Sequence, residues 1–402
     1  MHSGIDLSKE RLRLSDSANP VAWGLAVLGL SGLAASFWLG YRSPEGPSHV
    51  LHSYLLSLSF FLSIALGALF FVILQHATRA GWSVVLRRLA EIIAANIPLL
   101  ALLAIPVAVG LHHLYRWADP AAVAGDHLLQ AKSPYLNPRF FVARLVVYFL
   151  LWSALSLYYL RTSLKQDESG DTTLTLRMQR VGAPALFFYG ITVTFAAFDL
   201  LMSLDPHWFS TVYGVYFFAG GVVGFFALLP IMIYLLQRSG HAAHTITIEH
   251  YHDMGKLLFA FVVFWAYIAF SQYMLIWYGN MPEETGWYLD RQTGGWTWTS
   301  LALLFGHFVI PFLALLSRFP KRRKGLLVGI ALWALIMHWV DLYWLVMPGG
   351  GGHAVLPGLA DLACTVGIGG VLAAATVFRM RRRALIPVRD PRLEESLRFE
   401  NA

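Results

Sequence analysis

The chain has 402 residues, of which 57% are hydrophobic and only 13% charged, and the charges gather at the ends of long apolar runs. Such a composition is typical of a membrane protein rather than of one large soluble core. The formal net charge of +7 comes from basic residues in short loops, so orientation in a membrane explains it better than nucleic-acid binding. The single cysteine, Cys364, excludes a disulfide framework, a cysteine-ligated iron–sulfur cluster within the chain and a C-x-x-C-H haem attachment site.

Ten apolar runs are long enough to form helices that cross a bilayer, which takes about 20 residues for a hydrocarbon core of roughly 30 Å. They follow a polar segment, residues 1–20, in which no cleaved signal peptide is evident. The predicted spans lie at about 21–41, 52–76, 89–114, 138–162, 180–204, 211–238, 254–278, 298–319, 325–346 and 357–379. The third is the least regular, because polar and helix-breaking residues interrupt it, namely Glu91, Asn96, Pro98 and Pro106. We expect the charged tail, residues 380–402, to lie on the membrane surface or against a partner.

Basic residues are distributed unequally between the two sides of this arrangement. One side collects those of the N-terminal segment, the tail and four loops, at 79–88, 161–180, 238–256 and 318–324. The other side has only Arg42, Arg116, Lys132, Arg139 and Arg291. The positive-inside rule therefore predicts that both termini of the chain are cytoplasmic, which agrees with an even number of spans.

A short pattern recurs near the outward ends of the fifth and ninth spans. Asp199-Leu200 is followed after five residues by Pro206, and Asp341-Leu342 is followed after five residues by Pro348. The two copies lie four spans apart, as a parallel duplication of a four-helix unit would place them. The sequence therefore predicts an all-α polytopic membrane domain over 21–379. Its two superimposable four-helix bundles would occupy about 52–204 and 211–346, with one flanking helix at each end.

Ionisable residues inside the spans are costly in a bilayer and are functional candidates by default. Candidates for quinone binding or a proton path on the outer side are Arg144, Asp199, Asp205, His207, His307, His338 and Asp341. Candidates for a proton path on the inner side are His76, Glu91, Asp253 and Lys256. His338 and Asp341 are three residues apart and share one helix face. Polar groups near both surfaces with a drier middle are typical of two half-channels for protons.

Each of these candidates also has a purely structural interpretation. Arg144 and Asp199 can form a neutralised pair that fixes helix packing, and His307 and His338 can be satisfied polar residues between helices. Asp341 favours a functional role, because it lies deep and is flanked by aromatic residues. The deep histidines do not supply the two stacked axial pairs of a diheme bundle. Four inner histidines lack a firm ligand pattern, so we expect no metal site there: His241, His244, His250 and His252.

Two stretches carry a resemblance to a known family. They run from Phe198 to Gly221 (FDLLMSLDPHWFSTVYGVYFFAGG) and from Glu249 to Thr285 (EHYHDMGKLLFAFVVFWAYIAFSQYMLIWYGNMPEET). The chain resembles ActF, the smaller NrfD-like membrane subunit of alternative complex III, a quinol:electron-acceptor oxidoreductase of the bacterial cytoplasmic membrane. The resemblance implies two four-helix bundles flanked by two outer helices. It also implies a quinol pocket near the outer face of one bundle, at the position matched here by Asp199 to His207.

The resemblance further implies the partners and cofactors of the chain. Expected partners are a larger NrfD-like subunit, an iron–sulfur subunit, multihaem cytochrome c subunits and, in some complexes, a terminal oxidase, all within membrane lipid. We expect no covalently bound cofactor in this chain. A quinone such as menaquinone is its expected ligand, and haem and iron–sulfur clusters are expected in the partner subunits alone.

Three functions from different classes stay open on this basis. The chain is a quinol-binding redox subunit, a proton-conducting subunit driven by a neighbour's chemistry, or a non-catalytic scaffold that anchors cytochrome and iron–sulfur subunits. A stand-alone secondary transporter is a weaker fourth, because no pair of broken helices in inverted halves is evident. Quinone recovered with the subunit favours the first, and proton translocation lost with quinol oxidation retained favours the second.

The topology is testable by site-directed labelling. In a Cys364→Ala background, single cysteines at Ser169 and Gly350 should react with a membrane-impermeant reagent from opposite sides of the membrane, because an odd number of predicted spans separates them. Labelling of both positions from the same side would refute the ten-span topology.

Overall fold

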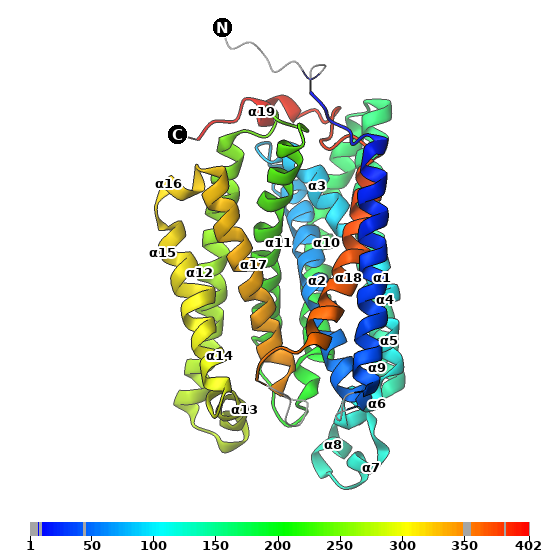
Figure 1. Cartoon of the computed structure of the whole chain (residues 1–402), viewed down its shortest axis with the longest axis vertical. Helices are drawn as coiled ribbons and strands as arrows, with labels where there is room; N and C mark the ends of the chain where they lie inside the picture. The colour runs from blue at the N-terminus through cyan, green and yellow to red at the C-terminus, as the bar shows by residue number, and fades with distance from the viewer. Residues whose placement is uncertain (1–6, 8–9, 43–45, 349–354, 382, 402) are drawn as a thin grey trace.

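The computed structural model describes residues 7, 10–42, 46–348, 355–381 and 383–401, and over these residues the chain forms helices and no strand (Figure 1). Ten of its helical segments are long and apolar enough to cross a membrane. This confirms the all-α, multi-pass membrane fold. The glycines at 349–352, including the labelling position Gly350, lie outside the described residues.

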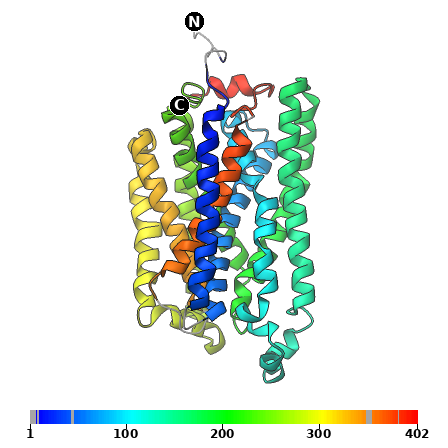
Figure 2. The same ribbon diagram turned by 45° about the vertical axis from the view of Figure 1, so that its right-hand side comes forward.

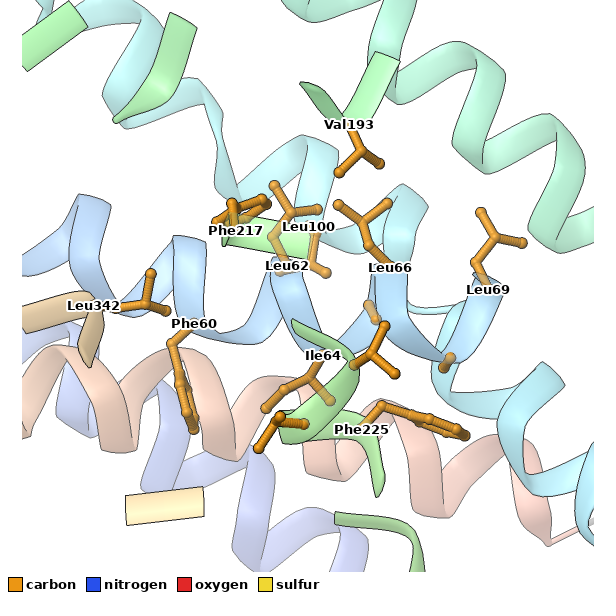
Figure 3. Close-up of a cluster of buried hydrophobic side chains, with 14 of the residues drawn as sticks. Phe60, Leu62, Ile64, Leu66, Leu69, Leu100, Val193, Phe217, Phe225 and Leu342 are labelled. Carbon is orange, nitrogen blue, oxygen red and sulfur yellow. The ribbon is translucent and has the colours of Figure 1, made fainter. Parts of the chain in front are cut away.

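Helix α2 (Gly46–Ala77) is the centre of the structure and is buried along most of its length. It contacts helices from both halves of the chain, and its apolar side chains Phe60, Leu62, Ile64, Leu66 and Leu69 lie in the core (Figure 3). Around them in the same view are side chains from four other helices, namely Leu100, Val193, Phe217, Phe225 and Leu342. This apolar cluster occupies the middle of the bundle.

The first group of helices packs around α2. It contains α3 (Val84–Ala94), α4 (Ile97–Leu103), α5 (Ile105–Val109), α6 (Leu111–Leu114), α9 (Pro138–Ser169) and α10 (Thr173–Leu200). The third span is divided as the sequence predicts, because Pro98 and Pro106 lack an amide hydrogen and each lies in the first turn of a new helix. Helix α9 continues past the predicted end at 162 to Ser169, and the next residue, Gly170, has a φ of 70°, which favours glycine.

The second group of helices is joined to the first through α11, which contacts both α2 and α10. It contains α11 (Tyr213–Arg238), α12 (Ile248–Gly279), α14 (Trp296–Ala302), η5 (Leu303–Val309), α15 (Ile310–Leu316), α16 (Arg318–Lys321) and α17 (Lys324–Val346). Segment η5 is π-helical and continues directly into α15. The two groups follow the predicted repeat, and their being separate, superimposable four-helix bundles stays a prediction.

The connections gather at two opposite ends of the bundle, which we call the terminus end and the loop end (Figure 1). The terminus end carries η2 (Asp16–Ala18) and α19 (Leu393–Leu397). The loop end carries η3 (Arg116–Ala118), α7 (Pro120–Ala124), α8 (His127–Lys132), η4 (Met202–Leu204) and α13 (Pro282–Gln292). The outer side predicted from the charges is the loop end.

The described part of the C-terminal tail packs on the helix ends of this same chain, which corrects the expectation that it lies on the membrane surface or on a partner. Leu385 and Ile386 are buried, and α19 contacts α3. Ser396 Oγ donates a hydrogen bond to the backbone oxygen of Trp82 at 2.5 Å, and Arg87 pairs with Asp390. Buried apolar residues and ion pairs within a charged segment hold it against the protein.

The first and last spans, α1 (Asn19–Arg42) and α18 (Leu359–Met380), pack closely against each other at the edge of the bundle (Figures 1 and 2). Glycines line the contact. A Cβ atom at Gly32 would lie 2.8 Å from the backbone nitrogen of Gly367, and one at Gly29 would lie 2.5 Å from the backbone nitrogen of Val371. Small residues of this kind let two helix backbones approach in a membrane.

Replacing Gly367 by leucine should separate α1 from α18. The new Cβ would lie 2.7 Å from the backbone nitrogen of Leu33, so the helices must move apart. We expect a loss of about 1–3 kcal/mol in the free energy of unfolding in detergent, as is usual for overpacking. Gly24→Leu in α1 is the control, because nothing lies within 4 Å of its Cβ position. Equal losses in both variants would contradict this packing.

Candidate functional site

The two predicted acidic centres differ in how their carboxylates are held. Asp199, in α10, is buried and forms two parallel hydrogen bonds with Arg144 of α9, both at 2.8 Å. Tyr148 donates a third hydrogen bond to the same carboxylate at 2.8 Å. The guanidinium of Arg144 also lies 3.8 Å from the ring centre of Tyr135. Asp199 is therefore fully neutralised, as the structural interpretation of this pair requires.

The residues that follow Asp199 do not gather around its carboxylate. Asp205 and His207 lie at the loop end, where His207 Nε2 contacts Asp126 at 2.7 Å. Hydrogen bonds from the backbone amide of Leu129 and from His207 lower the pKa of Asp126. The structure thus separates Asp199 from Asp205 and His207, which the sequence places together.

Asp341, in α17, is as deeply buried as Asp199, and among the described residues it has no cationic partner. The hydroxyl of Tyr216, from α11, donates a hydrogen bond to Oδ1. The indole Nε1 of Trp265, from α12, donates one to Oδ2 at 3.2 Å. Helices α11, α12 and α17 therefore meet at the Asp341 carboxylate, whose hydrogen-bond donors are both neutral.

Two histidines lie beside Asp341. His338, one turn earlier in α17, contacts Ser63 of α2 through Nε2 at 2.8 Å. His307 lies in the π-helical segment η5 and packs on Trp265, with ring centres 4.0 Å apart and ring planes tilted by 31°. The rings of the two histidines are 6.4 Å apart. The predicted candidates His307, His338 and Asp341 thus form one cluster, to which the wider turn of η5 contributes His307.

A cavity of about 800 Å³ lies next to this cluster, between α12 and the eighth span. Its lining is mainly aromatic and aliphatic, and Tyr216, Trp265 and Trp344 form the wall toward Asp341. Polar groups come from Gln292, Thr297 and Ser300. The opposite rim contains the exposed side chains of Tyr267, Phe270 and Leu304. Apolar pockets with a few convergent polar groups are the usual form of small-molecule sites.

The predicted end of span five also has a cavity, of about 330 Å³, lined by Lys132, Tyr135, Asp205 and Trp208 among others. Neither Asp199 nor Arg144 lines it. Lys132 donates a hydrogen bond to the backbone oxygen of Pro206 at 2.6 Å, and burial lowers its pKa. The smaller cavity therefore has no direct access to the buried carboxylate that the sequence singles out.

Helix α13 covers the loop end of the second group and joins it to the first. Arg291 is buried and forms no salt bridge among the described residues. It donates to the backbone oxygens of Trp344 and Leu345 at the end of α17. Its burial lowers its pKa to about 10. Trp287 stacks on Trp208, which follows α10, with ring centres 4.3 Å apart. Sequence reasoning counted Arg291 only as an outer charge.

The inner candidates form separate groups at the terminus end. Glu91 is fully buried and pairs with Arg88 at 3.0 Å, and Arg88 also pairs with Asp167 at 2.8 Å. His76 is buried and stacks on Tyr159, with ring centres 5.2 Å apart. Glu91 is thus part of an ion-pair network at the end of the first group.

The other two inner candidates lie at the start of α12. Asp253 pairs with Lys256 one turn later, and Lys256 contacts Asn401 in the tail at 2.7 Å. Within the described residues, no group of three or more histidine, cysteine or acidic side chains could hold a metal ion.

Removing the cation at the first acidic centre should be strongly destabilising. Arg144→Met leaves the Asp199 carboxylate buried and unpaired, for which we expect a loss of roughly 3–5 kcal/mol in the free energy of unfolding in detergent. Arg144→Met combined with Asp199→Leu should recover most of that loss, because no buried charge then remains. A single variant as stable as the parent, or a double variant with no recovery, would contradict a structural role for this pair.

Neither a protein-family model nor a curated protein sequence matches the chain.

Proposed function

We propose that this chain is an integral membrane subunit of a quinol:electron-acceptor oxidoreductase of the alternative complex III type, and that the 800 Å³ cavity binds the quinol ring. The observation that carries the proposal is the carboxylate of Asp341. It is buried, lacks a cationic partner among the described residues, and is bonded to Tyr216, whose side chain lines the cavity. A titratable group placed behind a cavity wall in this way is a candidate proton acceptor.

The chemistry of quinol oxidation fits these residues. Oxidation releases two protons and two electrons, so a hydroxyl of the ring needs an acceptor within hydrogen-bond reach. Tyr216 can accept a proton from the ring hydroxyl while it passes its own proton to Asp341 Oδ1, so that charge does not build up on the tyrosine. The electrons pass to an acceptor that a partner subunit holds. The aromatic lining and the rim facing the bilayer suit a flat ring with an apolar tail.

This assignment moves the quinol site from the first helix group to the second. The resemblance points to the stretch from Asp199 to His207, but Arg144 and Tyr148 occupy the carboxylate of Asp199. A carboxylate that is neutralised by a bidentate arginine is a poor proton acceptor, because protonation would strand the buried guanidinium. Tyr216 and Trp265, which hold Asp341, both lie within the two stretches that carry the resemblance.

The proposed setting of the subunit follows the same resemblance. It would lie in the bacterial cytoplasmic membrane with its terminus end in the cytoplasm, next to a larger NrfD-like subunit, an iron–sulfur subunit and multihaem cytochromes. The second candidate function is proton conduction across the membrane. The buried network of Glu91, Arg88 and Asp167 at the terminus end favours it. The side chains labelled in Figure 3 are all apolar, so they contribute no proton relay in the core around α2.

Substitutions at the two acidic centres should distinguish these functions in the intact complex. Tyr216→Phe and Asp341→Asn should each lower the rate of quinol oxidation in proteoliposomes by about 100-fold or more, the usual contribution of a positioned proton acceptor. Asp199→Asn should leave that rate within a few-fold of the parent. Tyr273→Phe is the matched control, because Tyr273 lines the cavity and Asp341 has other donors.

Two other outcomes would refute the proposed quinol site. Unchanged oxidation in Tyr216→Phe and Asp341→Asn, with fewer protons translocated per electron, would favour the proton-conducting subunit. Parent-like oxidation and proton yield in all variants would favour the scaffold. Binding of a photoreactive quinone analogue, with adducts mapped to the cavity lining, checks the site without relying on turnover.

A further inference from the structure

A second cavity, of about 330 Å³, lies at the loop end of the first helix group, where Figure 1 shows α8. Lys132, the last residue of α8, lines it together with Asp205, which directly follows the fifth span. That span ends at Leu204, so both charged side chains lie just outside the membrane-spanning segment. The proposed quinol site uses none of these residues.

The two charged groups of this cavity have capacity for further partners, and neither forms a salt bridge among the described residues. Lys132 Nζ donates to the backbone oxygen of Pro206 at 2.6 Å, which leaves two of its three hydrogens. Asp205 Oδ1 accepts from the backbone amide of His207 at 3.2 Å, and Oδ2 has no donor among the described residues. Arg291 attracts this carboxylate but does not line the cavity. Burial lowers the pKa of Lys132 although Asp205 attracts its ammonium, so a bound anion would stabilise the charged form.

Aromatic side chains form the membrane side of the cavity. Phe195 and Phe198 come from the last turns of α10 and Phe209 from the segment after it, and Phe195 and Phe209 are exposed. Phe187, Ile191 and Phe195 recur every four residues and are all exposed, so one apolar face of α10 runs from the cavity into the membrane. An apolar cavity of about 270 Å³ lies between the same stretch of α10 and α11. The site is therefore charged at the membrane surface and apolar within the membrane.

We propose that this cavity binds the headgroup of a phospholipid that carries a primary ammonium, as phosphatidylethanolamine does. Lys132 donates to the phosphate, and Asp205 accepts from the ammonium. A cavity of about 330 Å³ holds a headgroup but not two acyl chains, so the chains lie outside it. The exposed face of Phe187, Ile191 and Phe195 is the surface that they contact.

The two charges that line the cavity select this lipid class. A headgroup with a phosphate and no ammonium, such as phosphatidylglycerol, would bring a second negative charge to the Asp205 carboxylate. A choline headgroup has the same net charge as ethanolamine, but its quaternary ammonium has no hydrogen to donate to Asp205. Ethanolamine alone of the three makes charge-assisted hydrogen bonds with both Lys132 and Asp205, and these are the stronger kind.

Binding of defined lipids to the delipidated full-length chain in detergent tests the proposal, with native mass spectrometry as the readout. The three lipids carry identical acyl chains. We expect phosphatidylethanolamine to bind about tenfold more tightly than phosphatidylcholine or phosphatidylglycerol, the usual contribution of one charge-assisted hydrogen bond. Equal binding of the three lipids, or tighter binding of either of the other two, would overturn the inference.

Substitutions assign the preference to this cavity. Asp205→Asn should remove most of it, because the ammonium loses a charged acceptor and phosphatidylglycerol no longer meets a negative charge. Lys132→Gln should weaken phosphatidylethanolamine and phosphatidylglycerol about tenfold, since both have the phosphate, and Lys132→Arg should retain binding. Asp290→Asn, an exposed carboxylate of α13 that does not line the cavity, is the matched control. An unchanged preference in Asp205→Asn, or an equal loss in Asp290→Asn, would contradict the site. The preference is a ratio measured on one sample, so a partly unfolded variant does not alter it.

A map of the intact complex in a bilayer that contains phosphatidylethanolamine gives an independent check. We expect phosphate density within hydrogen-bond distance of Lys132 Nζ and acyl-chain density along the exposed face of α10. A segment of a partner protein or a quinone ring in the cavity, or a cavity without lipid density, would overturn the inference. Neither measurement involves Tyr216 or Asp341, so its outcome leaves the proposed quinol site unchanged.

Discussion

In a membrane interior, every ionisable side chain has to find its partners within the protein, and this constraint separates the two acidic centres. Asp199 satisfies it with a cation, since Arg144 holds both carboxylate oxygens. Asp341 satisfies it with a phenol and an indole. The first arrangement fixes one charge state and suits a permanent joint between α9 and α10. The second tolerates a proton on the carboxylate, which is the property that a site for proton chemistry requires.

The fold was largely accessible from the sequence, because the apolar runs and their charged ends carry most of the information. All ten spans are found, and the prolines divide the third as expected. Boundaries were less accurate: α9 continues through a polar stretch to Ser169, since exposed charged residues favour helix as readily as apolar ones. The tail was misplaced, because burial of Ile386 and Asp390 depends on helix ends far away in the chain.

The candidate site was only partly accessible. Sequence spacing placed His338 and Asp341 on one helix face, and aromatic neighbours singled out Asp341. The sequence did not identify Tyr216 or Trp265 as partners of Asp341. In a chain that is 57% hydrophobic, a tyrosine or a tryptophan is expected in the core or facing lipid, and only the packing of the helices shows that these two contact the carboxylate. The π-helical register that brings in His307 has no evident signal in the sequence either. The same local sequence pattern therefore occurs at Asp199, which pairs with a cation, and at Asp341, which has neutral donors. Only the tertiary contacts distinguish the two carboxylates.

The pairing of α1 with α18 has a consequence for how the chain assembles. Helix α1 is synthesised before its main partner α18, which follows more than 300 residues later. Until then α1 can contact α2, but its glycine-lined face that meets α18 lies against lipid or the insertion machinery. Docking of α1 on α18 is thus a late, long-range step, and the extensive, glycine-lined contact between the two helices offsets its loop-closure cost. The contact between α1 and α18 therefore forms only after all the spans between them have been inserted.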